Sequence, residues 1–227
     1  MPTLEQNESV YILRFSTPEN VDEAPDNVFS PDFLDSIESC LDTLEAAEGP
    51  AALVTIGAGK FYSNGLDVEY GFRDAETLNP YIERVHRMFA RFLELPMPTV
   101  AAINGHAFGA GAMLSLCHDM RIMRTGRGFW CLPEAARGMP FPPGMNALVT
   151  GSLPPQTARL AMLTSQRFGA EDALAAGIVD AVAEESALLD EATQRATAAT
   201  LLDGKNLKGI RAGIHANTLA ALALPQE

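Results

Sequence analysis

The stretch LPMPTVAAINGHAFGAGAMLSLC, residues 95–117, contains the pattern that decides the fold of this 227-residue chain. Its apolar run at 99–103 is typical of a parallel strand that is buried on both faces. A turn with three glycines follows at 104–111, and the composition of 110–117 predicts an apolar helix. A buried strand, a tight turn and a helix, in this order, form the repeating unit of an α/β fold.

The flanking sequence continues this order on both sides. Ser30 is a suitable N-cap for a first helix because Pro31 follows at the first helical position. Pro96 and Pro98 end a second helix. The predicted strands are 10–15, 51–56, 121–123 and 128–131, the predicted helices are 31–46 and 81–92, and the chain beyond Pro154 has a helical pattern apart from 178–182. The sequence therefore predicts an α/β core followed by a helical C-terminal part.

The composition is typical of a globular protein and excludes several classes of function. The chain has 16 basic and 29 acidic side chains, and its net charge of −13 argues against broad nucleic-acid binding. No apolar stretch approaches the ~20 residues that span a bilayer, and residues 1–10 lack the features of a signal peptide. Three widely spaced cysteines, Cys40, Cys117 and Cys131, fit reduced thiols. We therefore expect a cytoplasmic protein without nucleic-acid or membrane partners.

The common cofactor and metal motifs do not fit this sequence. Residues 57–60 (GAGK) are similar to a phosphate-binding loop, but Phe61 stands where that loop needs Ser or Thr. The chain has no G-x-S-x-G elbow and no HExxH zinc motif. His118 and Asp119 are the nearest approach to a metal pair, and a helix-terminal histidine beside a structural carboxylate is the simpler interpretation. We expect neither a metal site nor a nucleoside triphosphate site.

Two glycine-containing turns each follow a buried strand, at 61–67 (FYSNGLD) and 104–111 (NGHAFGAG). Small residues let a ligand approach the backbone, and the amides that open the second helix lie unsatisfied at its positive end. Two turns at the ends of neighbouring strands can aim two N–H groups at one oxygen, as in an oxyanion hole. The alternative is that the glycines only permit tight turns, and spacing alone does not decide between the two.

The chain resembles the crotonase superfamily of acyl-CoA enzymes in GKFYSNGLD (59–67), the run 95–123, and FWCLPE (129–134). The resemblance covers residues 10–180, and its Ser-Asn-Gly and Asn-Gly-His turns are most similar to those of Δ3,Δ2-enoyl-CoA isomerases. It implies a spiral of ββα units over residues 1–180, a helical trimerisation region over 181–227, and a homotrimer or hexamer. It also implies that a CoA thioester is the substrate and that no separate cofactor is needed.

The resemblance also assigns the site residues. The oxyanion amides fall on Leu66 and Ala110, and Ala110 replaces the middle of three glycines often found in this turn. Hydratases of the superfamily use two glutamates, whose positions are Met113 and Glu134 in this chain. Moving a proton along a 3-enoyl thioester needs one base, whereas adding water needs two polarising groups, so a single glutamate favours the isomerase. The resemblance further implies contacts with CoA or the acyl chain for Ala58, Lys60, Phe61, Ser63, Asn64, Gly65, Gly109, Met113 and Phe141.

Glu134 needs a pKa raised towards neutrality to act as this base, and desolvation has that effect. We expect the apolar walls around it to come from Leu66, Met113, Leu132, Met139 and Phe141. Asp67 is expected to be structural. Two alternatives stay open: a hydratase or another enolate-forming enzyme, against which Met113 argues, and a non-catalytic acyl-CoA-binding protein, against which Glu134 argues.

The C-terminal part is expected to serve CoA binding and assembly. Its basic residues are candidates for the CoA phosphates together with Lys60, and its apolar residues are candidates for subunit contacts. Segment 221–227 is not expected to supply the last helix that closes the pocket in other superfamily members. The basic candidates are Lys205, Lys208 and Arg211, and the apolar ones are Ile210, Ile214, Leu219 and Leu222.

Overall fold

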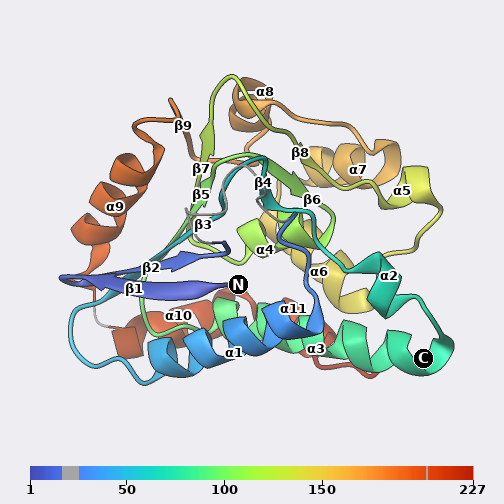
Figure 1. Ribbon diagram of the computed structural model, residues 1–227, viewed down its shortest axis with the longest axis horizontal. Coiled ribbons are helices and arrows are strands. Elements are labelled where there is room, and N and C mark those ends of the chain that lie inside the picture. The colour runs from blue at the N-terminus through green and yellow to red at the C-terminus, as the bar shows by residue number, and fades with distance from the viewer. Residues whose placement is uncertain (17–25, 203, 227) are drawn as a thin grey trace.

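The computed structural model describes residues 1–16, 26–202 and 204–226, which form two β-sheets surrounded by helices (Figure 1). The larger sheet contains β1 (Thr3–Asn7), β2 (Val10–Arg14), β3 (Ala52–Ile56), β5 (Thr99–Ile103), β7 (Met120–Arg124) and β9 (Ala181–Ala183), and the smaller contains β4 (Phe61–Ser63), β6 (His106–Phe108) and β8 (Trp130–Cys131). The orders are β1-β2-β3-β5-β7-β9 and β4-β6-β8. All neighbouring strands are parallel except β1 and β2.

Helices follow the strands in a repeated pattern. They are α1 (Pro31–Glu45), α2 (Val68–Gly71), α3 (Ala75–Leu93), α4 (Ala110–Leu116), α5 (Glu134–Arg137), α6 (Pro143–Ser152), α7 (Pro155–Thr164), α8 (Ala170–Ala175), α9 (Leu188–Ala199), α10 (Gly204–Ile214) and α11 (Ala216–Leu222). Strands β3 and β4 lead into α2 and α3, β5 and β6 into α4, and β7 and β8 into α5 and α6. Each unit gives one strand to each sheet and then a helix, so the predicted spiral of ββα units is confirmed.

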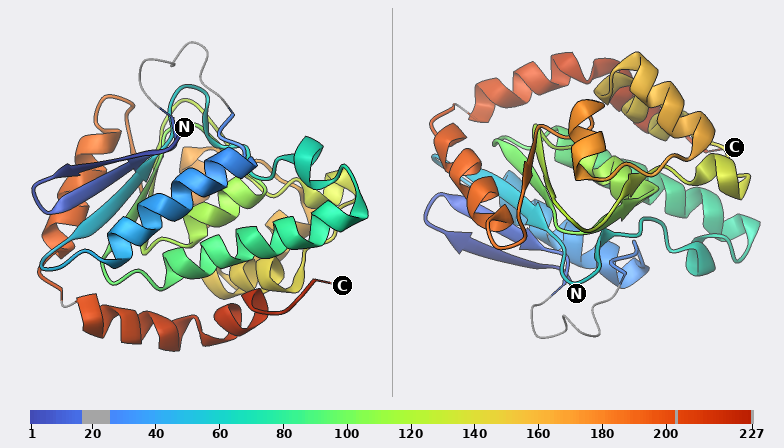
Figure 2. Two further views of the ribbon diagram at one scale, coloured as in Figure 1. Left: turned by 60° about the horizontal axis from the view of Figure 1, so that its bottom comes forward. Right: turned by 90° about the horizontal axis from the view of Figure 1, so that it is seen from above.

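The larger sheet is buried on both faces, as its continuous apolar strands predict. Val54 and Val100 pack with Ala192 of α9 on one face. Leu53 and Ala101 belong to the main core with α1 and α3 on the other face. Figure 2 shows α9 and the α1–α3 pair on opposite sides of the strands.

The main strands and helices lie where the sequence predicts them, and their ends have the expected caps. Ser30 Oγ accepts a hydrogen bond from Phe33 N at 3.2 Å, with Pro31 at the first helical position of α1. The sequence did not predict β1, β4, β6 or α2, which are short elements of three to five residues. The larger sheet also continues through β9, beyond the expected boundary at residue 180.

Candidate active site

The two glycine turns meet at the ends of neighbouring strands. Strands β4 and β6 lie within the two turns and are parallel and adjacent, so the residues that follow them, 64–67 and 109–111, lie at the same edge of the smaller sheet. Gly65 has a φ of +82°, and a Cβ atom there would come within 2.6 Å of Phe108 O and 2.8 Å of Ala110 N. Only a residue without a side chain permits this approach. The first turn therefore lies directly against the start of α4.

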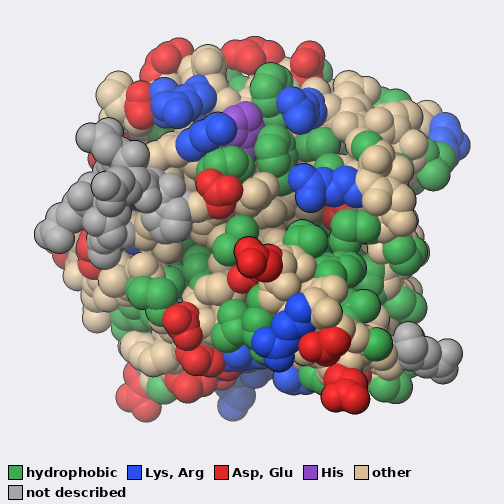
Figure 3. All heavy atoms as spheres, turned by 45° about the vertical axis from the view of Figure 1, so that its right-hand side comes forward, with side chains coloured by type: hydrophobic (Ala, Val, Ile, Leu, Met, Phe, Trp, Pro, Cys, Tyr) green, Lys and Arg blue, Asp and Glu red, His purple; other side chains and the backbone are tan. Residues whose placement is uncertain are grey.

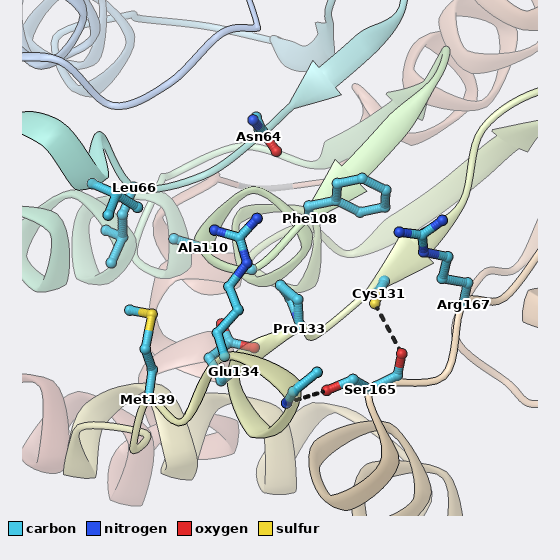
Figure 4. A pocket seen from close by; sticks show the side chains of 14 residues that line it. Asn64, Leu66, Phe108, Ala110, Cys131, Pro133, Glu134, Met139, Ser165 and Arg167 are labelled. Atoms are coloured by element: carbon cyan, nitrogen blue, oxygen red, sulfur yellow. Dashed lines mark hydrogen bonds between the residues drawn. The ribbon is translucent and has the colours of Figure 1, made fainter.

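Leu66 and Ala110 line the same cavity, of about 270 Å³ (Figure 4). Ala110 is the first residue of α4, so its N–H has no partner within the helix and lies at the positive end of the helix dipole. Within the described part of the chain, neither amide has a hydrogen-bond partner. The two N–H groups form the candidate oxyanion hole that the sequence predicts.

Glu134, the first residue of α5, faces this candidate oxyanion hole. A Cβ atom on Gly109 would lie 3.2 Å from Glu134 Oε1, so the carboxylate touches the backbone directly before Ala110. Its Oε2 is buried and has no hydrogen-bond partner among the described residues. Glu134 also lines a second, apolar cavity of about 680 Å³, and Leu66 and Met139 are shared by both cavities. The carboxylate therefore stands where the two cavities meet.

The surroundings of Glu134 change its proton affinity in the predicted direction. Burial raises its pKa from the usual 4.5 to about 7, while a hydrogen bond from its own backbone N–H and the charge of Arg137 act in the opposite direction. No cation in the described structure forms an ion pair with this carboxylate. A carboxyl group with a pKa near neutrality can accept a proton and return it, as a proton shuttle requires.

A buried hydrogen-bond network fixes the strand before the first turn. His118 Nδ1 lies 3.0 Å from Leu114 O and must donate to it, so His118 Nε2 accepts from Thr55 Oγ1 at 2.9 Å. Thr55 Oγ1 then accepts from the Tyr62 hydroxyl at 2.8 Å. Burial lowers the pKa of His118 to about 4, which agrees with a neutral ring. The network joins β3, β4 and α4, and it confirms the structural interpretation of His118.

The structure brings together some of the predicted contact residues and separates others. Asn64 and Gly109 line the smaller cavity, and Phe141 lines the larger one. Ser63 lines neither cavity, and its hydroxyl is fully buried and donates to Asn27 O at 2.7 Å. Met113 and Leu132 line neither cavity, because both are fully buried in the main core.

The remaining predictions concern the first turn and the carboxylate that caps α2. Ala58, Lys60 and Phe61 lie outside the walls of both cavities, with Phe61 packed against His106 at a ring separation of 5.3 Å. Asp67 accepts a hydrogen bond from Tyr70 N at 3.0 Å and caps α2, so its expected structural role is confirmed.

The basic residues at the cavity differ from those that the sequence suggested. Arg211 is buried and bound to Asp119, so it is wrong as a phosphate ligand. Lys205 and Lys208 line a separate cavity beside the start of α10. Arg137 and Arg167 line the smaller cavity instead, and within the described ranges neither forms an ion pair. Sequence reasoning missed them because no motif links two arginines on separate loops.

Positive charge gathers at the mouth of this cavity. Burial lowers the pKa of His106, and the charges of Lys60, Arg167 and Arg127 lower it further. Arg167 also lies over the Phe108 ring, 5.8 Å from its centroid. Figure 3 shows Lys and Arg side chains gathered beside a histidine on this face of the molecule. In an acidic protein, a cluster of cations that form no ion pairs with the described residues favours a local anionic ligand.

The described residues offer neither a metal site nor a membrane span. No group of three His, Cys, Asp or Glu side chains in these ranges is arranged to hold a metal ion. Within the same ranges, no helix combines the length and the apolar character needed to cross a bilayer.

Comparison with known proteins agrees with this geometry. A family model described as enoyl-CoA hydratase/isomerase matches residues 5–216. Enoyl-CoA delta isomerase 3 of Arabidopsis thaliana is 34% identical, over 82% of this chain and 79% of that protein. The peroxisomal enoyl-CoA delta isomerase 2 of the same plant is 33% identical, over 82% of this chain and 78% of that protein. The structure of an enoyl-CoA hydratase/isomerase family protein from Pseudomonas syringae has the same fold, with a TM-score of 0.89 and 24% identity over 97% of this chain and 93% of that one. The chain belongs to the enoyl-CoA hydratase/isomerase family, within the crotonase superfamily of enzymes.

Proposed function

We propose that this protein is an enoyl-CoA isomerase that converts 3-enoyl-CoA to 2-enoyl-CoA in fatty acid metabolism. One observation carries the proposal: among the described residues, Glu134 is the only carboxylate on the walls of either cavity, and it faces the Leu66 and Ala110 amides. Hydration needs a second polarising group, and the position expected for it is the buried Met113. The names of the two plant relatives support the same assignment.

The reaction in this proposal is a proton transfer from C2 to C4 of the acyl chain. The thioester oxygen accepts hydrogen bonds from the two amides, and the Glu134 carboxylate removes a proton from C2. The electrons of the broken C–H bond enter a dienolate, whose negative charge rests on the thioester oxygen. The Glu134 carboxylic acid then returns the proton to C4, which leaves a double bond between C2 and C3. The apolar surroundings exclude the water that would otherwise protonate the dienolate.

A panel of 2-enoyl and 3-enoyl CoA thioesters tests this function. We expect the protein to isomerise the 3-enoyl compounds and to hydrate the 2-enoyl compounds slowly. Fast hydration without isomerisation would assign a hydratase instead. Binding of these thioesters without any turnover would assign a non-catalytic acyl-CoA-binding protein.

The raised pKa of Glu134 predicts a pH dependence. The base must be ionised, so kcat/KM for a 3-enoyl thioester should rise through pH 7 and become constant above it. Because the pKa of Glu134 is higher in the folded than in the unfolded state, its contribution to the free energy of unfolding is most favourable below pH 4.5. This contribution is lost between pH 4.5 and 7. A pH–rate profile checks the first expectation. A rate that is constant from pH 5 to 8 would exclude Glu134 as the titrating base.

We propose that the phosphates of CoA bind at the cavity mouth, near Lys60, Arg127 and Arg167. Phosphate contacts are electrostatic, so affinity for CoA should fall as salt concentration rises. Replacing Lys60 or Arg167 by Ala should weaken CoA binding about tenfold, since a charged hydrogen bond contributes about 1.5 kcal/mol or more. Titration calorimetry of the variants measures this.

The matched control for CoA binding is Lys208→Ala, which removes the same kind of charge beside a different cavity. We expect this variant to bind CoA as the wild type does. If Lys208→Ala weakens binding and Lys60→Ala does not, the phosphates lie at the C-terminal helices and not near Lys60.

We propose a homotrimer or a dimer of trimers, built on closed symmetry. Ile210 and Ile214 of α10 are 50% and 70% exposed, and such apolar patches are typical of contact surfaces. Leu219 and Leu222 pack against the core of their own chain, which leaves α10 as the candidate contact helix. Light scattering at micromolar concentration should give three or six chains, and Ile214→Glu should shift the mass towards one chain. A wild-type monomer would contradict the proposal.

The cytoplasmic location stays a prediction from the cysteine pattern. Cys40, Cys117 and Cys131 are free thiols in the structure, which agrees with a reducing compartment. Two relatives carry the word peroxisomal in their names, so localisation of a tagged full-length chain is the deciding measurement.

A further inference from the structure

The segment after α11, residues 224–226, forms part of the wall of the larger cavity. The other walls come from α3, the loop before α6 and the first turn of α6, through apolar residues such as Ile82, Phe141 and Met145. Glu134 and Leu66 belong to the same cavity, so its interior leads to the catalytic carboxylate. Its volume of about 680 Å³ lies within the range of small-molecule sites. Segment 221–227 supplies no helix beyond α11, as the sequence predicts, but its residues 224–226 form part of this wall.

Two hydrogen bonds hold this tail segment (residues 224–226) on α3. Asn79 Nδ2 donates to Gln226 O at 3.3 Å, and Gln226 N donates to Glu83 Oε1 at 3.1 Å. Asn79 and Glu83 are four residues apart on α3, so both lie on the helix face beneath the tail. In Figure 1 the C-terminal end lies beside the first turns of α3, on the side of α2 and α5.

The tail differs from the other walls in how it is fixed. Leu222, just before it, is only 4% exposed and packs closely on Gly144, where a Cβ atom would come within 2.8 Å of Leu222 Cδ2. Leu224 is 49% exposed, and the tail therefore depends mainly on its two hydrogen bonds to α3. A segment held in this way can leave α3 at a low cost in free energy, whereas wall residues that are packed in the core cannot move as easily.

We propose that the tail segment, held by Asn79 and Glu83, is the specificity determinant for acyl-chain length. The proposal rests on the isomerase function and names its substrate class, a straight aliphatic acyl thioester whose chain extends from Glu134 towards residues 224–226. The apolar walls favour each added methylene until the chain reaches the tail. Beyond that length, either the tail must leave α3 or the chain must fold back.

The experiment measures binding of saturated straight-chain acyl-CoAs from C4 to C16 by calorimetry, together with kcat/KM for the matching 3-enoyl-CoAs. In the wild type, affinity should rise about fourfold per methylene and then stop rising at a defined length. The double variant Asn79→Ala/Glu83→Ala, which loses both hydrogen bonds, should move this limit to longer chains by two or more carbons. Leu224→Trp, whose larger side chain occupies part of the cavity, should move the length limit to shorter chains.

Glu83→Gln is the matched control, because its side-chain oxygen still accepts the hydrogen bond from Gln226 N. It should retain the wild-type length limit, whereas Glu83→Ala should not. The same limit in all variants, with their melting temperatures unchanged, would overturn the proposal. Failure of the isomerase function would appear separately, as absence of turnover for every 3-enoyl-CoA, and the binding series would still report the length limit.

Discussion

Glu134→Gln should lower kcat for isomerisation of a 3-enoyl-CoA by at least about 10²-fold, while CoA binding is retained. General acid–base catalysis contributes about 10² to 10⁴ in rate, and Glu134 is the only carboxylate that the described structure has on either cavity. The glutamine keeps the size of the side chain but cannot take up the C2 proton. Steady-state kinetics with one 3-enoyl thioester, and calorimetry with CoA, measure the two effects.

The same variant should be more stable than the wild type at pH 8. A pKa raised from 4.5 to about 7 corresponds to about 3 kcal/mol of unfavourable ionisation in the folded state. The buried amide of the glutamine loses about 1 kcal/mol of this gain, because it lacks partners as Glu134 Oε2 does. We therefore expect about 2 kcal/mol more stability at pH 8 and no gain at pH 4, measured by urea unfolding.

These two results together separate a catalytic base from a structural acid. Loss of turnover with a gain in stability at high pH is the pattern expected for a group buried for function rather than for folding. Full activity in Glu134→Gln would exclude it as the proton shuttle. A loss of stability at pH 8 would show instead that the carboxylate is held by favourable contacts.

The sequence predicts well those strands and helices whose local residue pattern fits only one type of secondary structure. Segments 51–56 and 99–103 are continuous apolar runs between turn residues, and such runs suit a strand buried on both faces. Strands β4 and β6 have only three residues each and lie inside the glycine turns, so local periodicity does not reveal them. Their pairing depends on contacts between segments more than 40 residues apart.

In the candidate site, local sequence patterns likewise do not show which side chains meet only when the chain folds. The backbone donors and Glu134 could be predicted because each lies in a motif with fixed spacing. Met113 could not be placed, because every residue of α4 is buried and the helical pattern does not tell which face meets the cavity. Arg137 and Arg167 meet at the cavity only through folding of α5 and the loop after α7, which leaves no local signal.

Gly65→Ala should lower kcat by about 10² to 10³-fold, the loss expected when one oxyanion donor moves out of place. The new Cβ would lie 2.6 to 2.9 Å from Phe108 O, Ala110 N and Gly111 N, which are backbone atoms and cannot rotate away. The first turn must therefore move away from the start of α4, and the Leu66 amide moves with it. KM should change less than kcat, because contacts made by the rest of the CoA molecule are retained. Steady-state kinetics of the folded variant separate the two parameters.

Gly49→Ala provides the matched control, because Gly49 has almost the same φ, +83° against +82°, and a Cβ atom there would have no other atom within 4 Å. Both substitutions place an L-residue in the left-handed region, which costs about 1 to 2 kcal/mol of stability. Only Gly65→Ala adds the collision with the second turn, so the difference between the two unfolding free energies measures that collision. Wild-type kcat in Gly65→Ala would show that the two amides do not need their close approach, and would remove the oxyanion hole from this site.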